Sequence, residues 1–164
     1  MQLLHGISSE DLNKRPGNKW CVAEILSHLI TAEKMSLRYI QKKILGIEQI
    51  ADTGVWEEVK INLLKISQRL PGLKFKAPQS VIDNTPVYRD LTTLHHEWSN
   101  LREELHSLLE KIPDHYRKRK IYRHVYAGYL NIGHALVFLR EHISHHTPQI
   151  LKLVNNKSLI NIEI

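Results

Sequence analysis

Two histidines near the C-terminus, His142 and His146, are four residues apart in the run Arg-Glu-His-Ile-Ser-His-His-Thr-Pro-Gln-Ile. Four residues make about one turn of an α-helix, so both imidazoles would project from one helical face. Neutral imidazole binds zinc, nickel, copper and iron well. Two such rings on one face are what two ligands of one ion require, and the pair therefore predicts a divalent-metal site.

A third histidine, His28, lies far upstream on the apolar face of another predicted helix. Catalytic zinc sites commonly use three protein ligands and leave one position for water or substrate. We therefore expect His28, His142 and His146 to bind one ion, which would make a bound water or thiol more acidic. The alternative for His28 alone is a hydrogen-bonded core histidine. His145 would point about 100° away from His146, and we expect it beside the site or at its rim, unless it replaces one of the ligands.

The elements that must position these histidines are predicted to be helices, because apolar residues recur every three or four positions. In the last of them, His142 and His146 replace core positions in an otherwise apolar stripe. Residues 71–86 are rich in proline and are expected to be a long connection. Few strand-like alternations appear, so the pattern indicates an all-α protein. The predicted helices cover residues 20–45, 55–70, 87–111 and a segment from Gly128 or Asn131 to about Val154.

The composition is that of one globular domain spanning residues 1–164, with 42% hydrophobic and 24% charged residues. No apolar run approaches the roughly 18 residues of a membrane span, and the N-terminus does not resemble a signal peptide. The lone Cys21 cannot form an intrachain disulfide, and we expect a cytoplasmic protein. The net charge of +6 includes a basic cluster, residues 117–120 with Arg123, which we interpret as a solvated interhelical loop in preference to a nucleic-acid surface.

Both histidine segments resemble the DinB/YfiT-like superfamily over most of the chain. This resemblance implies an all-α four-helix bundle with a long crossover connection. It also implies that the three histidines bind a divalent metal ion, zinc or nickel, with Gln149 beside it. The family patterns are Trp, Glu and His at four-residue intervals, and a histidine pair followed by Gln and an apolar residue; here they are Trp20, Glu24 and His28, then His142, His146, Gln149 and Ile150.

Some members of this superfamily transfer a low-molecular-weight thiol such as bacillithiol, mycothiol or glutathione, and others are described as metal-dependent hydrolases. The resemblance therefore implies a metal-dependent enzyme that acts on a small-molecule substrate, of the thiol S-transferase or hydrolase type. The alternative is a metal-stabilised bundle without catalytic activity that acts as a homodimeric interaction protein. Nucleic-acid binding by the basic cluster ranks third.

The chain departs from the family pattern in two places. Cys21 stands where members often have Ser or Thr, so we expect Glu24 to keep only half of a helix-capping box. The segment before Trp20 is short, and Gly6 and the turn Arg15-Pro16-Gly17 limit any helix there. We therefore expect a short or clipped first helix, and a homodimer that covers the core left exposed.

Overall fold

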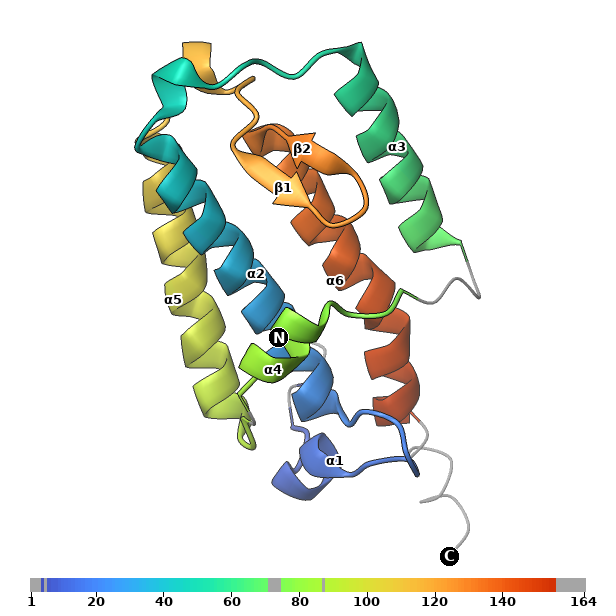
Figure 1. The fold of residues 1–164 in the computed structure, drawn as a ribbon. Helices are drawn as coiled ribbons and strands as arrows, with labels where there is room; N and C mark the ends of the chain where they lie inside the picture. Colours follow the sequence, from blue (N-terminus) through green and yellow to red (C-terminus); the bar gives the residue numbers. More distant parts are fainter. Residues whose placement is uncertain (1–3, 5, 71–74, 87, 156–164) are drawn as a thin grey trace, which may run out of the picture.

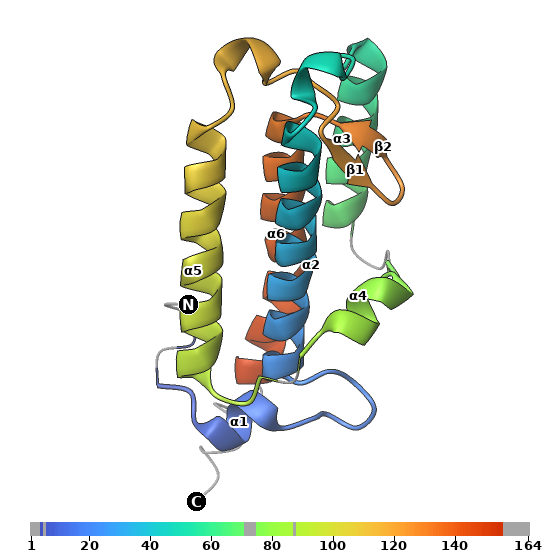
Figure 2. The ribbon, with the colours of Figure 1, turned by 60° about the vertical axis from the view of Figure 1, so that its left-hand side comes forward.

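The computed structural model describes residue 4 and residues 6–70, 75–86 and 88–155. Within these residues the long helices are α2 (Val22–Ile44), α3 (Val55–Arg69), α5 (Leu91–Glu110) and α6 (Ile132–Asn155). Helices α2 and α6 lie side by side, α5 packs against α2, and α3 packs against α6 (Figures 1 and 2). The structure thus confirms the predicted all-α bundle. No described helix combines the length and the hydropathy that a membrane span requires.

The core of the bundle lies around α2, which contributes apolar residues to both of its neighbours. On α5 the facing residues are leucines at helical spacing, among them the fully buried Leu94. On α6 the stripe predicted from the sequence is buried at Ala135, Leu139, His146 and Ile150. The two histidine-bearing helices are therefore held together by the core itself.

The long connection between α3 and α5 contains a helix that the sequence did not predict. Helix α4 (Gln79–Asn84) interrupts the segment expected to be irregular, of which residues 71–74 lie outside the described part. The carbonyl oxygen of Pro78 accepts the N–H groups of Val81 and Ile82 at 2.9 and 3.2 Å and closes its first turn. Six residues are too few to show helical periodicity, so proline content alone led to the wrong assignment.

A β-hairpin lies between α5 and α6, where the sequence predicted a basic loop and the start of a helix. Strand β1 (Tyr122–His124) pairs in antiparallel fashion with β2 (Gly128–Leu130), and Arg123 is opposite Tyr129. Gly128 has φ +72°, a backbone conformation that glycine adopts without strain. The hairpin lies on the same side of the bundle as α4 (Figure 1). Three-residue strands show no measurable alternation, which explains the wrong prediction.

The N-terminal helix is short, as the sequence predicted. Helix α1 (Ser9–Asn13) packs against α2 and buries Leu12. All the long helices follow Trp20, however, so the bundle does not need a long first helix to be complete. The homodimer stays a prediction. A core left exposed by a short first helix can no longer be the reason for it.

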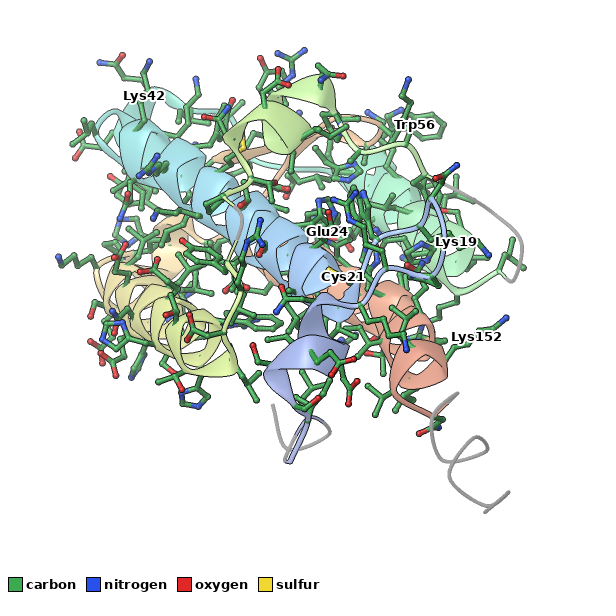
Figure 3. All side chains as sticks on the ribbon, turned by 90° about the horizontal axis from the view of Figure 1, so that it is seen from below. Lys19, Cys21, Glu24, Lys42, Trp56 and Lys152 are labelled. Atoms are coloured by element: carbon green, nitrogen blue, oxygen red, sulfur yellow. The ribbon has the colours of Figure 1, made fainter. Side chains whose placement is uncertain are left out.

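Helix α2 has Cys21 as its N-cap residue and keeps the Glu24 half of a capping box, as the sequence predicted. The N–H group of Cys21 donates to Glu24 Oε2 at 2.9 Å. Figure 3 shows both residues at the start of α2. The Cys21 side chain makes no capping hydrogen bond, in keeping with sulfur as a weak acceptor, and is instead buried in the core.

Helix α6 begins after Asn131, one of the two predicted starts. The Asn131 Oδ1 accepts a hydrogen bond from the N–H group of His134 at 2.9 Å, and the Asn131 Nδ2 donates to Thr53 Oγ1 at 2.8 Å. An Asn131→Ala substitution should lower the free energy of unfolding by about 1–2 kcal/mol in urea denaturation, because a buried N–H loses its acceptor. Asn131→Ser keeps a capping oxygen and should recover part of the loss. Equal losses in both variants would contradict the capping role.

Candidate metal centre

The three predicted histidines meet beside the cavity that opens between α2, α3 and α6. His28 comes from α2, and His142 and His146 come from successive turns of α6. The Nε2 atoms of His28 and His142 are 3.2 Å apart, and one nitrogen from each of the three rings lies within 4.8 Å of the others. This cluster could hold a metal ion.

The spacing and chemistry of the cluster fit a divalent ion. Two nitrogens bound to one tetrahedral zinc ion at about 2.0–2.1 Å lie about 3.3 Å apart, close to the 3.2 Å between His28 and His142. The Nδ1 atom of His28 is buried and has no hydrogen-bond partner among the described residues, so the only polar contact of its ring with these residues is the one between its Nε2 and His142. A purely imidazole donor set suits zinc, nickel or copper better than magnesium or calcium.

The rings are neutral near pH 7, as metal ligands must be. Burial lowers the pKa of His28, and it lowers the pKa of His146 to about 4. Burial, followed by the neighbouring imidazoles, lowers the pKa of His142 to about 2. Because a protonated imidazole has no free lone pair, these shifts keep nitrogens available for an ion.

Neighbouring side chains fix how the rings are oriented. His146 Nδ1 lies 3.2 Å from Gln149 Oε1, which places its N–H toward Gln149 and leaves Nε2 free. His142 stacks on Phe138, with ring centroids 5.4 Å apart, and His28 lies 5.2 Å from the ring of Trp20. Gln149 thus contacts the cluster directly.

His145 belongs to the wall of the cavity and not to the cluster. Its Nδ1 lies 2.9 Å from the backbone oxygen of Gln68 on α3. A carbonyl oxygen only accepts, so Nδ1 carries the hydrogen. The ring also lies edge-on to Phe75, with centroids 6.0 Å apart.

The cluster borders a cavity of about 470 Å³. Its walls come from α2, α3, α6, residues 75–82 and the hairpin, so the unpredicted elements complete it. None of the described residues that line it is an aspartate or a glutamate, whereas Lys76 and Arg123 are cationic. Many lining residues are aromatic: Trp20, Tyr39, Phe75, Tyr122, Tyr126 and Phe138.

Sequence reasoning missed His124, which lies on β1 and lines the same cavity. It has no partner at helical spacing, and only the pairing of the hairpin brings it to the cavity.

The members of the basic cluster, residues 117–120 with Arg123, have different surroundings in the structure. Three of its members form ion pairs, while Arg123 reaches the cavity; the pairs are Arg117 with Asp114, Arg119 with Asp52 and Lys120 with Glu57.

Comparison with known proteins gives one match. A family model described as the DinB superfamily matches residues 1–150, a range that contains all three clustered histidines and the cavity walls. No curated protein and no solved structure matches the chain.

Proposed function

Because the chain belongs to the DinB superfamily, we propose that it is a metal-dependent enzyme of the thiol S-transferase or hydrolase type that acts on small molecules. One observation carries this proposal: the histidine cluster borders a cavity large enough for a small molecule. Structural zinc sites are usually closed by four protein ligands, whereas catalytic sites keep an open position. Thiol chemistry and the single free Cys21 suit a reducing cytoplasm.

In this proposal His28, His142 and His146 would hold the ion, zinc or nickel, and Gln149 would orient His146. The ion would supply a Lewis acid that makes a thiol or water more acidic. The aromatic walls of the cavity would exclude water and bind the apolar part of the substrate. In a transfer reaction, the thiol sulfur would bond to an electrophilic carbon, that carbon would lose its leaving group, and the thiol proton would pass to solvent.

The test is turnover by the metal-loaded full chain. Monochlorobimane would report transfer from bacillithiol, mycothiol or glutathione, and p-nitrophenyl acetate would report hydrolysis. We expect one of these activities in the wild type and its loss in His142→Ala. His106→Ala is the matched control, because His106 lies exposed on α5 outside the cavity. Absence of both activities in protein that contains metal would contradict the enzymatic proposal.

The contact between Gln149 and His146 makes a separate prediction. Gln149→Leu should weaken zinc binding about tenfold, because His146 Nδ1 loses the acceptor that orients its ring. Competition with a chromogenic chelator would measure the change. Gln149→Glu retains an acceptor and should bind zinc at least as well as the wild type. Unchanged affinity in the leucine variant would show that Gln149 does not orient the ring.

The alternative function, a homodimeric interaction protein without catalytic activity, is favoured by the outer face of α3. An exposed apolar stripe runs along this face, opposite the side that buries Ile61 and Leu64. Figure 3 shows Trp56 on the outside of the molecule. Contiguous exposed apolar surface of this kind is typical of protein interfaces. The outer α3 stripe consists of Val55, Trp56, Val59, Leu63, Ile66 and Leu70.

Light scattering would test whether a second copy covers the outer α3 stripe. We expect a dimer at micromolar concentration, and a monomer for Leu63→Glu, because the new charge would be buried in the interface. Lys65→Glu places the same carboxylate on α3 away from the stripe, with an even larger change of charge, and should leave the dimer intact. A monomeric wild-type protein would exclude this interface.

A further inference from the structure

His124 is held in one tautomer by the hairpin. Its Nδ1 lies 3.2 Å from the backbone nitrogens of both Tyr126 and Ala127 and accepts their hydrogens. A nitrogen that accepts two hydrogen bonds carries no hydrogen, so the hydrogen of the neutral ring is on Nε2. Burial lowers the pKa of His124 to about 4, in agreement with a neutral ring.

The Nε2–H group of His124 has no hydrogen-bond partner among the described residues. The side chain is nine-tenths buried, with 8% of its surface exposed, and it lines the cavity. Its ring packs edge-on against Phe138 at 4.5 Å, and Phe138 stacks on His142. His124 is therefore close to the histidine cluster but does not belong to it. A donor that faces a cavity and has no protein partner usually meets water or a ligand.

The charges around the cavity favour a negative ligand. Lys76 and Arg123 line it, and the described lining residues include no carboxylate that would oppose an anion. The Arg123 guanidinium lies 5.5 Å from the ring of Tyr129, which holds it near the hairpin. A free N–H donor and two cations on the walls of one cavity, together with aromatic side chains, suit a ligand with an anionic head and an apolar body.

We propose that the cavity binds a small organic carboxylate with an apolar body, and that a carboxylate oxygen accepts a hydrogen bond from His124 Nε2–H. His124 is then a substrate-binding residue that sets the position of the anionic group. The aromatic side chains of Trp20, Phe75 and Tyr126 contact the apolar body. This inference rests on the proposed function, since it names the substrate class of the same site.

Calorimetric titration of the full chain with phenylacetate and with phenylacetamide tests the proposal. We expect phenylacetate to bind at least about tenfold more tightly than its neutral amide, because a hydrogen bond to a charged group is the stronger one. His124→Ala should remove most of this preference, because only the cations then remain to favour the anion. His124→Gln retains an N–H donor and should restore part of it, whereas His106→Ala should change nothing. Equal affinity of wild type and His124→Ala for phenylacetate would overturn the proposal.

Titrations of metal-loaded and chelator-treated protein separate this inference from the proposed function. A preference for phenylacetate that depends on His124 in both states supports the carboxylate site, even in a protein that retains no metal. Binding that is lost with the metal and is insensitive to His124→Ala would overturn the site but leave metal binding intact. If His124→Ala does not fold, two other variants test the proposal. Lys76→Met and Arg123→Met should each weaken the binding of phenylacetate and leave the binding of phenylacetamide unchanged. Unchanged phenylacetate affinity in both variants would overturn the proposal.

Discussion

A His142→Ala substitution is expected to weaken zinc or nickel binding by about a hundredfold to a thousandfold. The binding free energy of a structural zinc site is about 10–16 kcal/mol over four ligands. The loss of one ligand therefore removes several kcal/mol of binding free energy. The Nε2 atom of His142 lies 3.2 Å from that of His28, and His142 is one helical turn from His146, so it is close to both other ligands. Chelator competition would measure affinity, and elemental analysis of purified protein would measure metal content.

His145→Ala is the matched control for this substitution. His145 is the neighbour of His146 and borders the same cavity, but its Nδ1–H donates to the Gln68 carbonyl and its ring lies outside the cluster. We expect this variant to retain most of its metal. If His145→Ala lost the metal and His142→Ala kept it, the assignment of ligands would be wrong.

The metal-free protein is expected to lose stability steeply between pH 6.5 and pH 4. His124 and His146 have a pKa of about 4 in the fold and His142 a pKa of about 2, against an ordinary value of 6.5. Because these values are depressed, the unfolded chain binds more protons in this window, and acid favours unfolding. At pH 5 each of these three residues would lower the free energy of unfolding by about 2 kcal/mol. Together they would lower it by about 6 kcal/mol, which is comparable to the whole stability of a domain.

Urea denaturation of chelator-treated protein at pH 7 and pH 5 would measure this loss. His142→Leu cannot be protonated at that position, so its stability should fall by about 2 kcal/mol less than that of the wild type. His106→Ala changes an exposed histidine and should retain the full pH dependence. Equal stability of the wild type at both pH values would contradict a cluster of buried, neutral histidines.

The long helices could be predicted from the sequence because periodicity over many residues averages out local exceptions. The convergence of His28 with His142 and His146 could also be anticipated, since each lies on an apolar stripe. Helix ends were less certain. The helix predicted from residue 87 begins at Leu91, because the Asp90 side chain accepts the N–H group of Thr93 at 2.6 Å and caps it there.

The walls of the cavity could not be predicted, because they depend on short elements and on tertiary pairing. Helix α4 and the hairpin are too short to leave a periodic pattern. The direction of the His124 ring depends on two backbone N–H groups within one turn of the hairpin, which residue types do not encode. The candidate metal ligands can therefore be identified from the sequence, whereas the groups that face the substrate can be identified only from the structure.

X-ray absorption spectroscopy of the zinc- or nickel-loaded protein tests the three-histidine site most directly. The expected spectrum shows three imidazole nitrogens at about 2.0–2.1 Å, with the remaining coordination from light solvent atoms. Loss of one imidazole contribution in His142→Ala would identify that ligand. A sulfur ligand from Cys21, or fewer than three imidazoles in the wild type, would contradict a site built from His28, His142 and His146.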